Sequence, residues 1–412
     1  MHLHKTGLIL LAAVAWLAVT LPVHADEGQP VGVMDRSRPD YDAKGLPVGS
    51  FRLRPALDVG AAYDDNVYRT ATAKEHDFFY TIMPSLDFKS DWSRHLLELS
   101  GSLTRYQYNS KSSENRTDWY VAGNGRLDID RDAALEANGS YNVLHEPRYS
   151  ADQPGGAAEP TQYEILHGGS TLSYHPNRFG LELGGSYDRY DFDPTKLIGG
   201  GVFDNRDRNR DQYRGSARAS YEFAPGYALF LRGTYDTRRF DTVAGQARDS
   251  HGYRADAGAQ MFLTHLLQGE VFVGFASQKF KDPFRSVNAI DYGAKLHWYA
   301  TPLMTVHLTA SRLFHDTTIA GASATDDQFV SLAIDYELLR NLLLQAHVDF
   351  TDSRFLGIGR DDKLLETGLT AKYLINRYLS ADAGYAYQRR SSSAAGQGFT
   401  DNLFQAGLHF QL

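Results

Sequence analysis

The densest group of oxygen ligands in the sequence is the run Asp64, Asp65 and Asn66, with Asp77 nearby. Carboxylate and amide oxygens are the ligands that hard cations such as Ca²⁺ prefer. The spacing does not fit an EF-hand loop, which needs ligands at alternate positions and a glycine at the sixth. Asp and Asn also favour turns, because their side chains bond to the nearby backbone. We therefore expect a solvated turn at these residues and predict no metal site.

Histidine is the next candidate for chemistry, and the 15 histidines are dispersed along the chain. A hydrolytic site would need a histidine within hydrogen-bond reach of an acidic residue or a serine. His297, His347 and His409 stand on the polar side of alternating segments, but no paired motif accompanies them. The absence of cysteine removes disulfides and thiolate chemistry. We predict no catalytic residues and no cofactor, with a hydrolase kept as an alternative.

The longest connection, residues 193–209, contains the glycine run Gly199 to Gly201 and charges of both signs. Three glycines make a phosphate cradle only between a strand and a helix, and no helix is expected here. Long loops frequently carry function, so this one could fold inward as a constriction or a lid. We expect an external loop and keep the inward fold as the alternative.

Most of the chain alternates between apolar and polar residues with a period of two, which is typical of β-strands. In 213–223 the apolar or small face consists of Tyr213, Gly215, Ala217, Ala219, Tyr221 and Phe223. Segments 289–299, 342–351 and 403–412 show the same pattern. Such segments of about 10 residues suit transmembrane strands, whereas strands of soluble sandwiches are mostly about five or six residues long. The pattern indicates one face toward lipid and the other toward water.

The connections between these segments alternate in length. Short turns such as those near Pro176, Pro225 and Pro302 separate longer loops such as 148–161 and 193–209. Tight turns on one side and long loops on the other are typical of outer-membrane barrels, and we count about 18 strands, an even number that places both chain ends beside the short turns. The predicted fold is therefore an all-β, transmembrane, antiparallel up-and-down β-barrel with short periplasmic turns and longer extracellular loops. Tyrosine and tryptophan near strand ends are interpreted as interfacial girdles.

Charged residues recur on the polar face of the predicted strands. The positions predicted to line the lumen are Arg126, Glu182, Arg214, Arg218, Arg232, Arg254, Glu270, Asp291, Lys295, Asp335 and Asp382. In a wide barrel such charges sit in water, whereas on the buried face of a sandwich each would need a partner. Charges of both signs share this face, so the sequence does not indicate a preference for anions or cations.

Composition and the N-terminus define the compartment. After residue 25 no apolar run of about 20 residues occurs, which excludes a helical membrane protein. Residues 1–25 have a basic start, an apolar stretch and a small-x-small site ending at Ala25, so they predict a cleaved signal peptide. Residues 26–50 predict a periplasmic linker, and residues 51–412 the barrel. The net charge of -8 argues against nucleic-acid partners. Because the alternating strands predict a transmembrane barrel, the expected surroundings are outer-membrane lipid.

Several short motifs from residue 35 onward occur in a specific order. They are Asp35-Arg36-Ser37-Arg38-Pro39-Asp40-Tyr41-Asp42, Gly49-Ser50-Phe51, Pro55-Ala56-Leu57, Tyr63-Asp64-Asp65-Asn66-Val67-Tyr68, Ser90-Asp91-Trp92-Ser93-Arg94-His95, Gly125-Arg126-Leu127-Asp128, Asn205 to Arg210, Pro225-Gly226-Tyr227, Gly269-Glu270-Val271-Phe272, Ala320-Gly321-Ala322-Ser323 and Glu337-Leu338-Leu339-Arg340-Asn341. In this order they resemble the putative β-barrel porin 2 family.

That resemblance implies an outer-membrane barrel that is often associated with exopolysaccharide production and has no catalytic residues. The final strand departs from a common pattern of such barrels, since its last residue is Leu412 in place of an aromatic one. The expected function is a porin-like channel for hydrophilic solutes or for polysaccharide export. The alternative is a plugged structural barrel that anchors a periplasmic export complex through residues 26–50.

Overall fold

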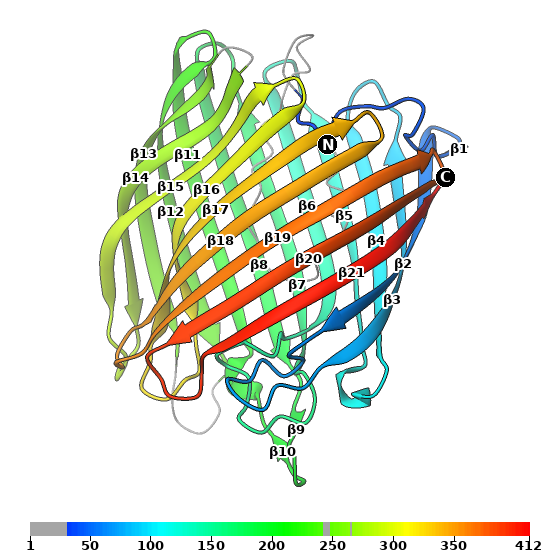
Figure 1. Ribbon diagram of the computed structural model, residues 1–412. Coiled ribbons are helices and arrows are strands. Elements are labelled where there is room, and N and C mark those ends of the chain that lie inside the picture. The colour runs from blue at the N-terminus through cyan, green and yellow to red at the C-terminus, as the bar shows by residue number, and fades with distance from the viewer. Residues whose placement is uncertain (1–30, 242–247, 264–265) are drawn as a thin grey trace.

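The computed structural model describes residues 31–241, 248–263 and 266–412, and they form one closed β-barrel (Figure 1). Eighteen antiparallel strands make the wall, as the alternating sequence predicts. The wall strands are β2 (Phe51–Asp64), β3 (Asp77–Ser90), β4 (Leu96–Tyr108), β5 (Arg116–Asp128), β6 (Ala133–His145), β7 (Gln162–Tyr174), β8 (Phe179–Phe192), β11 (Arg210–Ala224), β12 (Tyr227–Phe240), β13 (Ser250–Leu263), β14 (Leu267–Phe280), β15 (Val287–Thr301), β16 (Met304–Asp316), β17 (Ala324–Leu339), β18 (Leu342–Phe355), β19 (Asp361–Asn376), β20 (Leu379–Ser392) and β21 (Phe399–Gln411).

The barrel closes where its first wall strand pairs with its last. The ladder between β2 and β21 runs from Ala56 opposite Gln411 to Asp64 opposite Leu403. Each remaining wall strand pairs with the next wall strand along the chain, so the meander is up-and-down as expected. The C-terminus and the start of the described chain both lie at the end with the short turns (Figure 1). No helix among the described residues has the length and apolar character needed to cross a membrane.

The two faces of the wall differ as the alternation predicts. On β17, Val330 and Leu332 are 46% and 42% exposed on the outside, while Ser331 and Asp335 lie on the other face. Strand pairing carries this division around the barrel, because directly paired residues share a face. A closed belt of exposed apolar side chains is compatible only with lipid outside, so the polar face lines the lumen.

Several shorter elements lie outside the wall. β1 (Leu46–Val48) forms a hairpin with the start of β2 at the short-turn end. β9 (Thr195–Lys196) and β10 (Val202–Phe203) form a second hairpin inside the long connection 193–209. It projects away from the barrel at the long-loop end (Figure 1), and Ile198 near its tip is 76% exposed. The inward fold considered for this loop is therefore not the one that the structure adopts.

Two short 3-10 helices that the structure describes in full stand in extracellular loops. They are η1 (Ser112–Glu114) between β4 and β5 and η2 (Arg206–Arg208) between β10 and β11. Each places one charged side chain, Glu114 or Arg208, in a buried position. Both buried residues belong to the network that organises the extracellular mouth.

Candidate functional site

The candidate site is the lumen together with its two mouths. Strand parity places every charged residue predicted for the lumen on the polar face, on strands β5, β8, β11 to β15, β17 and β20. One group of these side chains is joined by ion pairs. Glu270 accepts from Arg218 at 2.8 Å and from Arg232 at 3.2 Å. A single carboxylate thus links strands that are three apart in the wall.

The same wall contains two further ion pairs. Arg232 lies 3.1 Å from Asp256, and Arg254 lies 3.5 Å from Asp291. Inward-facing rings complete this layer, since the Arg218 guanidinium lies 3.9 Å from the centroid of Phe230. Cation–π contact of this kind orders a guanidinium as well as stabilising it. The aromatic partners were missed from the sequence, although Phe230 alternates in phase with Arg232.

The other predicted lumen residues have different neighbours. Arg126 pairs with Asp128 at 2.8 Å, and Glu182 lies 3.7 Å from His175. For three further predicted residues, the neighbours are the residues paired with them on the adjacent strands. These pairs are Arg214 with Ser186 and Asp236, Lys295 with Glu270 and Thr309, and Asp382 with Lys372 and Gly407. The charges therefore lie on nine of the 18 wall strands, with most of them on β11 to β15, and do not form one compact centre.

The extracellular mouth is crossed by the connection between β6 and β7, residues 146–161, which we call the crossing loop. At its base, Arg148 donates to Glu114, with 2.8 Å between Nε and Oε2, and Glu114 is only 1% exposed. Arg208 of η2 donates to Glu146 at 2.9 Å between Nη1 and Oε2. Buried, hydrogen-bonded ion pairs hold their geometry firmly, because breaking one leaves an uncompensated charge.

The far end of the crossing loop reaches the opposite side of the barrel. Asp152 accepts hydrogen bonds from the Thr317 hydroxyl and the Thr318 backbone N–H, both at 2.7 Å, in the loop between β16 and β17. The Tyr149 ring lies 6.2 Å from Phe399 on β21. The loop therefore spans the extracellular opening and narrows it. Nothing in its own sequence distinguishes it from the other long loops, because its partners are remote along the chain.

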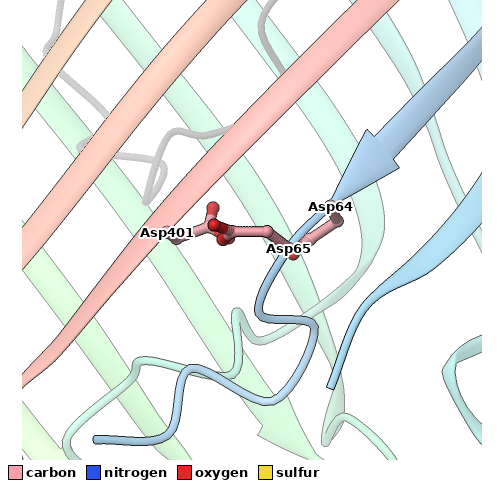
Figure 2. A group of neighbouring side chains, drawn as sticks. All are labelled: Asp64, Asp65 and Asp401. Atoms are coloured by element: carbon pink, nitrogen blue, oxygen red, sulfur yellow. The ribbon is translucent and has the colours of Figure 1, made fainter. Parts of the chain in front are cut away.

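The acidic group near the start of the barrel is larger than the sequence suggests. Asp64 and Asp65 are joined by Asp401 from β21, and their carboxylate oxygens lie within 4.8 Å of one another (Figure 2). Arg69 balances this charge, at 2.9 Å from Asp64 and 3.0 Å from Asp401. Asn66 is fully buried and donates its N–H to Asp64 at 2.8 Å. The Arg69 side chain thus holds the extracellular ends of β2 and β21 together by pairing with a carboxylate from each.

Asp64, Asn66 and Asp77 are buried, so the solvated turn expected from the sequence is not what the structure shows, and Asp65 and Asp77 accept hydrogen bonds from distant parts of the chain. Asp65 accepts from the backbone and the side chain of Asn402 at 2.7 and 2.6 Å. Partial burial acts to raise its pKa, but these hydrogen bonds outweigh it and hold the pKa of Asp65 below its usual value. Asp77 lies apart from the group and accepts from the backbone N–H groups of Ser110 and Lys111.

The periplasmic mouth contains residues 31–42, which we call the docked segment. Val33 is fully buried, and its N–H donates to the Thr305 hydroxyl at 3.1 Å on the inner face of β16. Arg38 forms an ion pair with Glu337 of β17 at 2.7 Å. Arg36 donates to the Pro302 carbonyl at 2.6 Å. The segment is thereby attached to the inside of the rim.

Beyond the docked segment the chain crosses the mouth to reach β2. Gln411 donates to the Tyr41 carbonyl at 3.0 Å, and Gly45 donates its N–H to the Leu412 carbonyl at 3.1 Å. Residues 26–50 are predicted as a periplasmic linker, and its part from residue 31 is folded against the rim. The reason is that Arg36 and Arg38 find Glu337, a partner about 300 residues away that local sequence does not reveal. Residues 26–30, like the expected signal peptide 1–25, lie outside the described residues.

A chain of polar groups lies on the wall beneath the docked segment. The Nδ1 atoms of His297 and His307 are 2.6 Å apart, and His307 Nε2 lies 2.9 Å from Asp335. Asp35 faces this chain. Partial burial raises the pKa of its carboxyl and the Asp335 carboxylate adds to the rise, while His307 opposes it. The fold thus brings together two histidines and a predicted lumen aspartate.

The two other candidate histidines stand elsewhere on the inner face. His409 lies 2.7 Å from Asp58 across the β2–β21 junction, and His347 lies 3.9 Å from Asp349 on its own strand. Each histidine therefore has a carboxylate neighbour. Contacts of this kind orient an imidazole by fixing which ring nitrogen faces the carboxylate.

The sequence matches the family model described as putative β-barrel porin 2 over residues 38–412. No curated protein matches it. Similar solved structures come from Pseudomonas aeruginosa. The outer membrane protein OpdK is 12% identical, with 87% of this chain and 99% of that chain covered and a TM-score of 0.42. OccK2 in complex with glucuronate is 12% identical, with 90% and 100% covered and a TM-score of 0.46.

Proposed function

Since this chain belongs to the putative β-barrel porin 2 family and is an outer-membrane channel, we propose that it carries hydrophilic solutes, with an extracellular polysaccharide as its exported cargo. The observation that supports this proposal is the closed 18-strand wall with charged residues of both signs on its inner face. A wall of this size encloses more space than its side chains fill. Water therefore enters, and a hydrated chain of sugars finds hydrogen-bonding partners along the whole path.

The route to the membrane forms part of the same proposal. Residues 1–25 direct the chain through the inner membrane and are removed after Ala25, and the barrel then assembles from the periplasm. The lumen acts by passage alone. The wall offers imidazole–carboxylate contacts such as His307 with Asp335, and we assign them to the orientation of polar groups and not to catalysis.

The experiment that tests the proposal is single-channel recording of the mature protein in a planar bilayer. Sugars of increasing size are added to one side, and conductance is followed as each is excluded. The expected result is a discrete conductance that linear oligosaccharides interrupt. A barrel with no conductance, or with a current that oligosaccharides leave unchanged in mean and noise, would contradict the channel or its saccharide specificity, respectively.

A second candidate function is an anchor for a periplasmic export complex, and one observation favours it. Residues 31–48 are folded against the periplasmic rim, so any partner of the residues that precede them is positioned beside the lumen. Deleting residues 26–45 separates the two functions. A channel still conducts, with a conductance raised by the loss of the docked segment, and still supports export, whereas an anchor loses export while the barrel remains assembled.

A further inference from the structure

We propose that the seam between β15 and β16 is a lateral gate, through which the acyl chain of an amphipathic saccharide passes between the lumen and the outer leaflet. The saccharide part of this inference rests on the proposed function. The seam itself is a separate structural feature. It combines an interrupted ladder, a pair of side-chain bridges and an apolar groove on the same strands.

The interruption is visible in the strand register. β15 and β16 pair from Gly293 opposite Ser311 to Trp298 opposite Val306, and again at Thr301 opposite Met304. On the extracellular side of that ladder, residues 287–292 pair with β14 and residues 312–316 pair with β17. The ladder between β16 and β17 continues through to Asp316 opposite Ala324. The gap therefore separates β15 from β16 while each of these strands stays paired with its other neighbour.

Two side-chain bridges replace the ladder where it is missing. Arg312 donates Nη1 to the Ile290 carbonyl at 3.2 Å and also bonds to Asp326 at 2.8 and 2.6 Å. The Tyr292 hydroxyl donates to Gln328 at 3.0 Å, which spans β16 from outside. In a bilayer every backbone polar group needs a partner, so Arg312 satisfies a carbonyl that a strand would otherwise satisfy. Bridges of this kind can open without unfolding a strand.

The bridges lie at the level of the outer leaflet surface. On the outer face of β17 the apolar residues Ile334, Leu332 and Val330 are followed by Gln328 and Asp326 toward the extracellular end. A change from apolar to polar side chains marks the boundary between hydrocarbon and head groups. An opening here connects the lumen with the head-group region, which is where the polar part of an amphipathic molecule resides.

An apolar groove of about 420 Å³ lies on the outer surface of the same strands, on the periplasmic side of the gap. It is lined by Leu266, Leu267, Leu296, Trp298, Val306, Leu308 and Leu332. In the membrane such a groove cannot hold water favourably, and its apolar lining suits an acyl chain. The polar bridges above it suit a head group, so the pair of features matches one amphipathic molecule.

The lumen side of the gap also offers a hydrogen bond. Ser311 forms the last ladder pair and is 2% exposed, and within the described part of the chain its hydroxyl has no hydrogen-bond partner. A buried hydroxyl without a partner is costly, and a sugar hydroxyl that enters the gap would remove that cost. Apolar, charged and hydroxyl contacts therefore line one route from outside to inside.

The test uses the absence of cysteine in the chain. The gate pair is Ile290→Cys with Phe314→Cys, which would face each other if the ladder continued. The control pair is Ala294→Cys with Ala310→Cys, which are partners in the existing ladder. Single channels are recorded with maltose and with dodecyl maltoside, first reduced and then oxidised. We expect the control pair to oxidise readily and the gate pair only slowly.

The blocking experiment then distinguishes the two proposals. Oxidation of the gate pair is expected to abolish block by dodecyl maltoside and to leave block by maltose unchanged, while the control pair alters neither. Equal block by dodecyl maltoside before and after locking, or oxidation as fast as in the control, would overturn the gate. If maltose fails to block any form, the proposed function fails instead. Arg312→Ala provides a second check, because loss of its bridge should increase dodecyl maltoside block without changing barrel assembly.

Discussion

The two mouths of the barrel are narrowed in different ways. At the extracellular mouth the crossing loop is attached through buried ion pairs at its base and hydrogen bonds at its tip. At the periplasmic mouth the docked segment precedes the wall in sequence and is held mainly by Arg38 with Glu337 and by Val33. The loop is fixed at both ends by flanking strands, whereas the segment has a wall strand on one side only.

This difference indicates which of the two segments can leave its mouth at the lower cost in free energy. Releasing the crossing loop leaves Glu114 and Arg148 without their partners in a poorly hydrated place, which costs much more than exposing surface charges. Releasing the docked segment also separates a buried ion pair, Arg38 with Glu337. It separates one such pair, whereas the crossing loop has two, Glu114 with Arg148 and Glu146 with Arg208. We therefore infer that the extracellular constriction is permanent and the periplasmic one is removable.

The largest effect is expected from Glu114→Ala. Removing this carboxylate leaves Arg148 buried without its partner, which costs about 3–5 kcal/mol of local stability. The crossing loop should then leave the mouth. Conductance should rise, and trypsin should cleave after Arg148 in the intact barrel.

Glu159→Ala is the matched control in the same loop. Glu159 pairs with Lys196 at 3.2 Å, but the two side chains are 36% and 71% exposed. Such a pair contributes at most about 1 kcal/mol, so conductance and cleavage should stay at the wild-type level. If the two variants behave alike, the extracellular mouth is not held by its buried ion pairs and the contrast between the mouths disappears.

A smaller effect is expected at the other mouth from Glu337→Gln. The change keeps the shape of the side chain but removes the charge that Arg38 contacts, for a loss of about 1.5–3 kcal/mol in docking. A nitroxide at Asp40→Cys should become more mobile, and conductance should rise less than in Glu114→Ala. Asp91→Asn, which removes an exposed partner of Arg52 at the same end, should change neither. An immobile label in Glu337→Gln would show that other contacts hold the segment.

The sequence predicts the wall far better than the mouths. Alternation along β11 and β17 specifies which residues face lipid, because a period of two is a local property of a strand. It therefore yields the strand number, the order of turns and loops, and the face on which Arg218 and Asp335 lie. The partners of Glu114 and Asp152 are not local. They depend on which loops meet across a closed barrel, which no periodicity encodes.

The same distinction explains two features of the site that the sequence does not show. Loop 193–209 attracts attention by its length and glycines, yet the shorter crossing loop spans the extracellular opening because Arg148 and Asp152 find partners on opposite sides. Asp64 and Asp65 stand out as a cluster, but Asp401, from the last strand, completes it. Closure of the barrel brings the first and last wall strands together, and the contact of Asp401 with Asp64 and Asp65 cannot be predicted from residues that lie so far apart in the sequence.

The substitution Glu270→Gln tests whether the wall between the two mouths contributes to ion selectivity. This carboxylate balances Arg218 and Arg232, so its neutralisation leaves two cations facing the lumen. The reversal potential in a salt gradient should shift toward anion preference. Asp352→Asn removes the same charge from the outer face near the extracellular end, and it should leave the reversal potential unchanged. An unaltered potential in Glu270→Gln would show that the mouths alone set selectivity.

The smallest effect concerns pH at the periplasmic mouth. The pKa of Asp35 is raised in the docked state by partial burial and by Asp335, so docking favours its protonated form. Docking should be tightest below the usual pKa of an aspartate and should weaken as pH rises through the raised value. Because Asp35 remains in contact with lumen water, the change should stay below about 1 kcal/mol. The label at Asp40→Cys should report this step in the wild-type background and lose it in Asp35→Asn. A step that persists in Asp35→Asn would show that Asp35 is not the group that couples docking to pH.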